Sequence, residues 1–183
     1  MDFIKLLTTC AEIIGLEFSD ELLLGGKEEL ARDVTVKRLL NCANSVLDSL
    51  YRSYSRISRN TVIQVVNGFA ETESLKLIKV NSLTDSCGNA VKFRYRDNGL
   101  LVDTDGRYNL SYVHAPAEIT VDSQIILPSP RISERIFVYG VIAEYYTLTG
   151  DLTLAAVWND KYLNALQVLS LSVTSVMPVR GWL

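Results

Sequence analysis

Residues 106–150, GRYNLSYVHAPAEITVDSQIILPSPRISERIFVYGVIAEYYTLTG, contain the change of pattern that decides the fold. The stretch begins with alternating polar and apolar residues, which are typical of a β-strand. A connector punctuated by Pro116, Pro128 and Pro130 follows. Apolar residues then recur at helical spacing on almost every side between 132 and 148. We therefore expect a strand, a connector and a buried helix, in that order.

Four helices are predicted in the chain as a whole. Apolar residues spaced by three and four predict helices over residues 3–17, 28–54, 132–148 and 152–169. Ser133 is expected to cap the third helix, Gly150 to end it and Asp151 to cap the fourth.

The third predicted helix is apolar all round, so we expect it to be the central member of a helical bundle. The fourth helix carries its apolar stripe at residues that include Trp158 and Tyr162. The Thr149–Asp151 turn brings these two helices together. Trp158, Tyr145 and Ile142 are therefore predicted to lie in the core between them.

Residues 61–120 have a different period. Short alternating or β-branched runs in this region predict an antiparallel sheet of about four or five strands. Asn98-Gly99 and Asp105-Gly106 are predicted to form type I′ hairpin turns, because both central residues of such a turn need positive φ.

This order of elements predicts an α+β fold, with an antiparallel β-sheet lobe inserted between helices 2 and 3 of a four-helix bundle. We expect the bundle to comprise residues 1–60 and 129–169 and the β-lobe residues 61–128. Residues 170–183 lose the helical period but keep apolar side chains, so we expect an extended C-terminal docking tail.

Composition excludes several classes of protein. The 183 residues are 48% hydrophobic with a net charge of −3, which argues against wholesale wrapping of nucleic acid. Charged residues interrupt every apolar run before it could span a membrane, and the N-terminus lacks the basic start of a signal peptide. Cys10, Cys42 and Cys87 have the spacing of neither a disulfide framework nor a zinc site. Cys10 and Cys42 lie on apolar helix faces, where we expect small buried side chains in a chain folded in a reducing cytoplasm.

Motifs for catalysis and cofactor binding are absent from the sequence. No Walker loop, GxGxxG, HExxH or G-x-S-x-G motif occurs. The DTDG stretch at Asp103 resembles the start of a calcium loop, but further oxygen ligands do not follow. A small hydrolase using His114 with Asp103 or Asp105 would lack an identifiable nucleophile. We therefore expect no enzyme, no cofactor and no metal site.

Two basic segments could contact a partner. In the first, Arg residues alternate with Tyr51 and Tyr54, which would suit phosphate binding and base stacking; alternatively, the tyrosines complete the buried stripe and the arginines are solvated. In the second, cations on one sheet face alternate with Phe93 and Tyr95 on the other, either as edge protection or as a surface for an acidic partner. The basic residues of these candidate sites are Arg52, Arg56, Arg59, Lys92, Arg94 and Arg96.

Residues 28–169 resemble the head-to-tail connector, or adaptor, proteins of tailed bacteriophages. The resemblance rests on the long helix ARDVTVKRLLNCANSVLDSLYRSY (31–54) and on the hairpins in FRYRDNGLLVDTDGRYNLSYVHAPAEIT (93–120). Its most telling stretch is ISERIFVYGVIAEYYTLTGDLTLAAVWNDKYLNAL (132–166), in which an apolar helix ends in paired aromatics and a short turn leads to a helix with Trp158 and Tyr162.

The resemblance implies a virion protein at the head–tail junction, made in the bacterial host cytoplasm and without catalytic residues. Such proteins form a homo-oligomeric ring, commonly of about twelve copies, whose contacts run head to tail and close by rotation. The ring binds the portal protein, receives a tail or tail-completion protein and encloses the channel for DNA ejection, with transient contact to the passing DNA. The residues expected to dock on the portal or a neighbour are Met177, Val179, Arg180, Trp182 and Leu183.

The alternative function is a small nucleic-acid-binding module that uses segment 50–60 and the strand at 92–96. Binding of duplex DNA at two salt concentrations would distinguish it from an adaptor.

Overall fold

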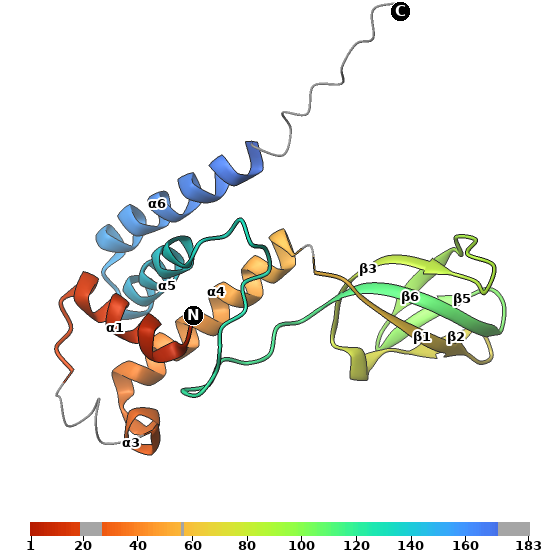
Figure 1. The fold of residues 1–183 in the computed structure, drawn as a ribbon, viewed down its shortest axis with the longest axis horizontal. Coiled ribbons are helices and arrows are strands. Elements are labelled where there is room, and N and C mark those ends of the chain that lie inside the picture. The colour runs from red at the N-terminus through yellow and green to blue at the C-terminus, as the bar shows by residue number, and fades with distance from the viewer. Residues whose placement is uncertain (19–26, 56, 172–183) are drawn as a thin grey trace, which may run out of the picture. The chain divides into compact units, whose positions relative to one another are not determined.

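The computed structural model describes residues 1–18, 27–55 and 57–171, and in these residues the chain has an α+β fold (Figure 1). It divides into two compact units, a helical unit (residues 1–47 and those after 117) and a β unit (residues 48–117). The helices are α1 (Phe3–Ile14), α3 (Lys27–Arg32), α4 (Val34–Tyr54), α5 (Glu134–Thr149) and α6 (Leu152–Leu171). The strands are β1 (Arg59–Val65), β2 (Phe69–Glu71), β3 (Leu77–Thr84), β4 (Phe93–Arg96), β5 (Gly99–Val102) and β6 (Gly106–His114).

Helix α5 contacts three other helices of the helical unit. It packs against α1 and α6, and Ser45 on α4 donates a hydrogen bond to Glu144 on α5. A side chain at Gly140 would bring Cβ within 2.8 Å of Val46 on α4 and 3.0 Å of the Tyr162 ring on α6. Glycine at this position therefore allows three helices to approach closely. The residues of α5 that are buried are Ile136, Phe137, Val138, Gly140, Val141, Ile142, Ala143 and Tyr145.

The predicted boundaries of α5 and α6 are confirmed by their caps. The Ser133 hydroxyl accepts a hydrogen bond from the Ile136 amide, and Gly150 adopts the left-handed conformation that ends α5. Asp151 accepts from the Leu154 amide at 3.1 Å. These local signals determine where the α5–α6 hairpin turns.

The prediction of a single helix over residues 28–54 is wrong, because the chain breaks at Asp33. The Asp33 carboxylate accepts hydrogen bonds from the amides of Thr35 and Val36, at 2.8 and 2.9 Å. It therefore caps α4 and separates it from α3. An aspartate that satisfies free amides in this way competes with continuation of the preceding helix.

We expect Asp33→Ala to lower the free energy of unfolding by about 1 kcal/mol, because two amides at the start of α4 lose their acceptor. Urea unfolding of the purified chain would measure the loss. Asp33→Asn is the matched control, since asparagine also caps helices. An alanine variant as stable as the wild type would show that the cap contributes nothing.

The predicted core between α5 and α6 is only partly correct. Ile142 and Tyr145 are buried, with 0% and 8% exposure, whereas Trp158 is half-buried. The Trp158 ring packs against Tyr139 with centroids 5.5 Å apart, and the Lys161 ammonium lies 3.9 Å from its centroid. Trp158 therefore covers the edge of the α5–α6 contact, with one side open to solvent.

For Trp158→Ala we expect a loss of about 1–3 kcal/mol, below the 3–5 kcal/mol typical of a buried ring, because part of the indole is exposed already. Thermal unfolding would measure it. Lys161→Met removes the cation and retains the aliphatic stem, so it separates the cation–π contribution from ring burial. A loss as large as that of a core phenylalanine would contradict this partial burial.

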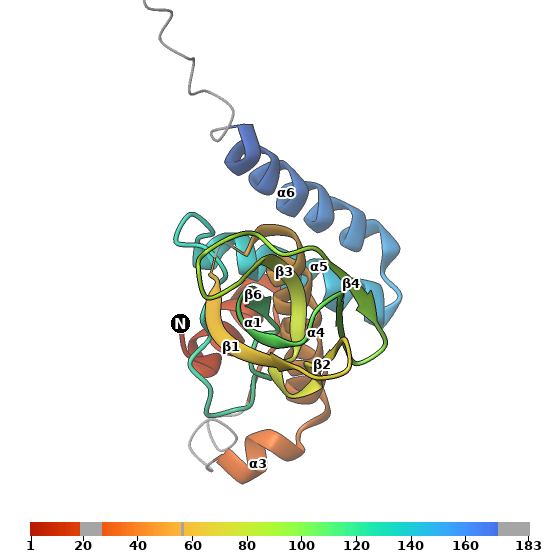
Figure 2. The ribbon, with the colours of Figure 1, turned by 90° about the vertical axis from the view of Figure 1, so that its right-hand side faces the viewer.

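The β unit is built from two three-stranded antiparallel sheets, in the orders β1-β6-β3 and β2-β5-β4 (Figure 2). The sheets approach each other at two corners: Val66 and Phe69 exchange backbone hydrogen bonds at one, and the Val91 amide donates to the Leu83 carbonyl at the other. The two sheets enclose a common core. Its buried members are Ile63, Val65, Ala70, Val80, Leu83, Leu100, Val102, Tyr108, Leu110 and Tyr112.

The single sheet of four or five strands that the sequence predicts is therefore wrong, although the antiparallel arrangement is confirmed. Strand β6 is central to its sheet and pairs with β1 and β3, while β5 is central to the other. Strand β3 has two register shifts. Such irregularities bend a strand and help it turn a corner between sheets.

Both predicted type I′ turns are also wrong. The β4–β5 turn is made by Asp97 and Asn98, of which Asp97 has positive φ, and Gly99 already belongs to β5. Asp105 precedes β6 and Gly106 is its first residue, and the sheet of β6 does not contain β5. The signature instead fits Asn67-Gly68, where φ is 53° and 75°. The Asp105 carboxylate accepts from both of these amides, at 3.0 and 2.7 Å.

Candidate functional site

The predicted C-terminal docking residues, Met177, Val179, Arg180, Trp182 and Leu183, lie outside the described residues. Within the described part, the last element is α6, which continues to Leu171.

The residues of the basic-aromatic segment 50–60 differ in burial and pairing within the described part of the chain. Tyr51 is buried, in agreement with its role as the end of the apolar stripe. The Arg52 guanidinium donates to the Asp48 carboxylate at 2.7 Å, and this hydrogen bond raises the pKa of Arg52. Arg59 is exposed at the start of β1, and Arg56 lies outside the described residues. Of the cations in this segment, Arg52 is thus already paired within its own helix.

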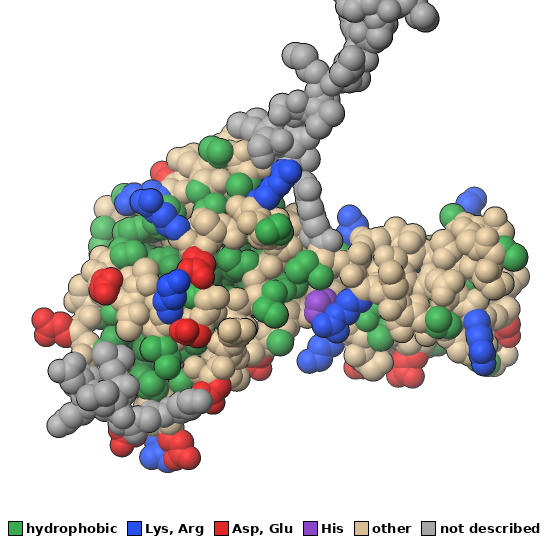
Figure 3. All heavy atoms as spheres, in the orientation of Figure 1, with side chains coloured by type: hydrophobic (Ala, Val, Ile, Leu, Met, Phe, Trp, Pro, Cys, Tyr) green, Lys and Arg blue, Asp and Glu red, His purple; other side chains and the backbone are tan. Residues whose placement is uncertain are grey.

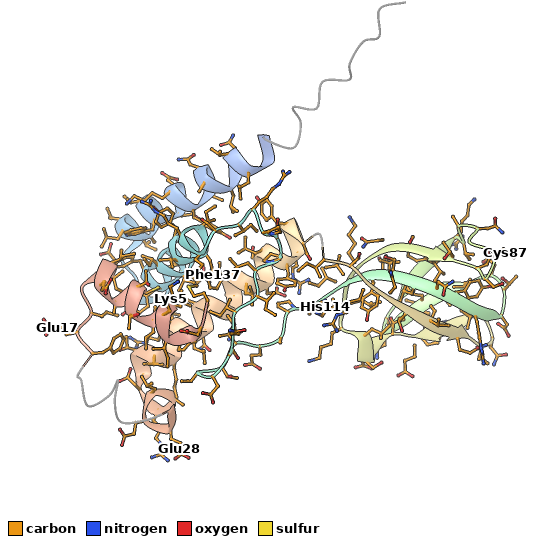
Figure 4. All side chains as sticks on the ribbon, viewed as in Figure 1. Lys5, Glu17, Glu28, Cys87, His114 and Phe137 are labelled. Atoms are coloured by element: carbon orange, nitrogen blue, oxygen red, sulfur yellow. The ribbon has the colours of Figure 1, made fainter. Side chains whose placement is uncertain are left out.

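His114 and the aspartates of the DTDG stretch do not meet. Asp105 directly precedes β6 and His114 ends it, so about 30 Å of extended chain separates them. Figure 4 shows His114 at one end of the β unit, far from the β3–β4 loop with Cys87. The His114 ring packs edge-on against Tyr51, with centroids 6.2 Å apart, and its buried Nδ1 has no hydrogen-bond partner.

Burial, and then the nearby Arg59 charge, lower the pKa of His114. A neutral histidine is thus favoured by folding. Above the ordinary pKa near 6.5 both states are neutral and His114 has no pH-dependent effect; as pH falls below it, the unfolded chain takes up the proton first and stability decreases. The decrease ends once the pH passes the lower pKa of the folded state.

Because His114 is the only histidine, we expect His114→Gln to flatten the dependence of unfolding free energy on pH between about pH 7 and pH 5. Urea midpoints measured across this range in wild type and variant would test it. Parallel curves for the two proteins would contradict the role of His114.

Cys10 and Cys42 are buried, as predicted, and Cys87 is exposed. Burial, reinforced by the neighbouring Cys42, raises the pKa of Cys10 to about 12. Burial, with a smaller effect of Glu144, raises the pKa of Cys42 to about 11. Both thiols are therefore protonated and unreactive at neutral pH, consistent with packing roles.

The structure does bring Lys92, Arg94 and Arg96 together. All three are exposed, and Arg94 and Arg96 pair in register with Leu101 and Gly99 of β5. Because alternate residues of a strand point to one face, Arg94 and Arg96 share the side of β4 opposite Phe93, which packs against the core. Lys92 directly precedes β4 and lines a hollow together with Arg94. The predicted basic face therefore exists on the β2-β5-β4 sheet.

Phe69 adds an aromatic side chain to this face. A Cβ atom on Gly99 would lie 2.4 Å from the Phe69 ring and 2.3 Å from the Ala70 carbonyl oxygen. Glycine is thus required at position 99, because the ring of a neighbouring strand lies directly over it. Phe69 is opposite Leu101 in the register of β2 and β5. We call this surface, formed by Phe69, Leu101, Lys92, Arg94 and Arg96, the Phe69 face.

Two hollows border the Phe69 face. One, of about 650 Å³, is lined by Lys92, Arg94 and Leu101 and also by Phe93 and Val102, which belong to the opposite side of the sheet. The other, of about 370 Å³, is lined by Phe69, Arg96 and neighbouring residues. The face thus combines cations, apolar side chains and concave relief.

A second unusual surface is the outward side of α6. On its inward side Ala155 and Leu166 are buried, whereas Trp158 and Tyr162 of the predicted stripe are half-buried. Elsewhere on the helix, apolar side chains point to solvent, and Figure 3 shows hydrophobic side chains exposed over α6. The large exposed residues on α6 are Leu152, Leu154, Val157, Leu163 and Val168, with exposures between 38% and 69%.

Sequence reasoning missed both Phe69 and the outward side of α6. Phe69 follows an Asn-Gly dipeptide, and recognising that dipeptide as the I′ turn would have placed Phe69 at the start of a strand. The sequence of α6 shows apolar residues on every side of the helix. This pattern does not tell which of those sides packs against another part of the protein and which is exposed.

Among the described residues, no cluster of His, Cys, Asp and Glu side chains could hold a metal ion. No helix in the described ranges is long and apolar enough to cross a bilayer. In comparisons with known proteins, no family model and no curated sequence matches the chain.

Proposed function

We propose that this protein is a structural subunit of an oligomeric ring that joins the portal of a phage capsid to the tail and surrounds the DNA channel. The proposal starts from the resemblance of residues 28–169 to head-to-tail connector proteins. In it, α1, α4, α5 and α6 form the four-helix bundle, and the β unit is the inserted lobe. The portal, a tail protein and other copies of the chain are the partners, at the head–tail junction of the virion.

The observation that carries the proposal is the outward side of α6. Leu152 and Val168 are 69% and 67% exposed, near opposite ends of a 20-residue helix. An isolated protein gains nothing from such a surface, and contiguous exposed apolar residues usually mark an interaction site. A ring supplies the cover, because each subunit presents one surface to the neighbour ahead and a different one to the neighbour behind.

The α6 surface suits such a contact because its exposed residues form two flanks. At 100° per residue, Leu152 and Leu163 lie on one flank, about 60° from the buried Ala155 and Leu166, whereas Val157 and Val168 lie on another, about 160° from them. Either flank can pack against a neighbouring subunit while Ala155 and Leu166 remain against the subunit's own core.

Analytical ultracentrifugation over a range of concentrations tests ring formation. We expect a closed oligomer of about twelve copies that dissociates on dilution. Leu163→Glu and Val168→Glu should weaken assembly, each through its own flank. Val34→Glu is a matched control, because Val34 is also exposed (61%) but lies on α4. A chain that stays monomeric at the highest attainable concentration, or assembly weakened equally by all three variants, would contradict the proposal.

A further inference from the structure

We infer that the Phe69 face of the β2-β5-β4 sheet docks an extended acidic polypeptide segment of a partner protein, in which acidic and apolar residues alternate. The inference concerns the β unit alone. It goes beyond the proposed ring function and holds whether or not the chain assembles through α6.

The three cations of the face lack partners of their own. Within the described part of the chain, no carboxylate forms an ion pair with Lys92, Arg94 or Arg96. Arg52, by contrast, is paired with Asp48. Unpaired cations gathered on one face provide charge complementarity to an acidic partner, and the guanidinium groups can bind carboxylates bidentately.

Geometry favours an extended segment. Arg94 and Arg96 are two residues apart on one strand, so their positions repeat at about 7 Å, which is also the repeat of alternate side chains in an extended peptide. A peptide lying along β5 would direct one set of side chains toward the cations of β4. Its other set would point toward Phe69 on β2, and the two hollows provide room at either end.

Charge distribution favours polypeptide over nucleic acid. Glu71 and Asp97 line the hollow at Phe69, and Asp103 lines the hollow at Lys92. These carboxylates would repel a continuous chain of phosphates. Residues 48–117 contain nine Lys and Arg against seven Asp and Glu, which is close to balance. An acidic segment with apolar residues between its charges can place carboxylates beside the cations and leave uncharged groups beside Glu71 and Asp103.

Fluorescence anisotropy with a labelled peptide of alternating glutamate and leucine would test the inference on the full-length chain. We expect saturable binding at about 50 mM salt that weakens at about 300 mM. Arg94→Gln/Arg96→Gln should weaken binding about tenfold or more, since two charge-assisted contacts are lost. A peptide of alternating glutamate and serine should bind more weakly, because it has no apolar side chains for Phe69 and Leu101.

The matched control is Lys79→Gln/Arg107→Gln, which also removes two positive charges but from exposed positions on the β1-β6-β3 sheet. It should leave peptide affinity within about twofold of wild type. Circular dichroism would establish that both double variants are folded.

Three outcomes would overturn the inference. The first is no saturable binding of the glutamate-leucine peptide by the wild-type protein. The second is an equal loss in both double variants, which would mean that net charge alone is responsible. The third is displacement of the peptide by oligothymidylate at equal or lower concentration, which would make the face a site for single-stranded nucleic acid.

Discussion

Replacing Phe137 with alanine should lower the free energy of unfolding of the helical unit by about 3–5 kcal/mol. Phe137 is fully buried, with 0% exposure, and lies on α5, the helix that packs against α1, α4 and α6 (Figure 4). Truncating the ring removes its burial energy and leaves a cavity that close-packed helices fill only partly. This loss is a large fraction of the 5–15 kcal/mol by which a typical domain is stable.

Residues 48–117 contain no tryptophan and Trp158 lies on α6, so the fluorescence change of Trp158 during urea unfolding reports on the helical unit. Leu148→Ala provides the control on the same helix, because Leu148 is 58% exposed and its truncation should change stability by about 0.5 kcal/mol or less. If Phe137→Ala and Leu148→Ala had the same midpoint, α5 would not be the central helix.

The comparison of α5 with α6 shows how far a single sequence leads. Both helices have apolar residues on nearly every side, yet α5 buries eight residues while α6 exposes Leu152 and Val168. The periodicity of a sequence shows which side chains of a helix are apolar. It does not show which residues pack against them. We expected α5 to be buried because it is apolar all round, whereas nothing in the sequence marked the outward side of α6 as unpartnered.

The boundary between α3 and α4 and the division of the strands into two sheets were harder to predict than the helices and strands themselves. Leu30 and Val36 are both buried, so the apolar pattern continues through Asp33 and hides the boundary between α3 and α4. The division of the strands into two sheets depends on pairings such as Arg59 with Tyr112, which join residues far apart in the chain. Local alternation predicts that a strand exists, but its neighbour is determined by long-range packing.

The cations of the Phe69 face could be predicted from the sequence, but the position of Phe69 beside them could not, for a similar reason. Alternation in KFRYR predicts Lys92, Arg94 and Arg96 on one side of a strand; Arg94 and Arg96 do lie on one side of β4, whereas Lys92 precedes the strand. The position of Phe69 over Gly99 results from the pairing of β2 with β5. No local signal connects these two residues, which lie 30 positions apart.

Leu110→Ala should be the most damaging truncation of comparable size in the β unit, at about 2–5 kcal/mol. Leu110 is fully buried, and it lies on the central strand β6, opposite Thr61 of β1 and Leu83 of β3. It belongs to the core that both sheets share. The cavity left by alanine would therefore weaken the packing between the sheets as well as within one of them.

Amide hydrogen exchange of β6 would measure this loss, because tryptophan fluorescence does not report on the β unit. Val62→Ala is the matched control: Val62 lies on the adjacent strand β1, opposite Asn109, and is 61% exposed. We expect exchange of the β6 amides to accelerate by at least about thirtyfold in Leu110→Ala and by less than about threefold in Val62→Ala. Equal protection in the two variants would mean that Leu110 does not join the two sheets, and the enclosed core described for residues 48–117 would be wrong.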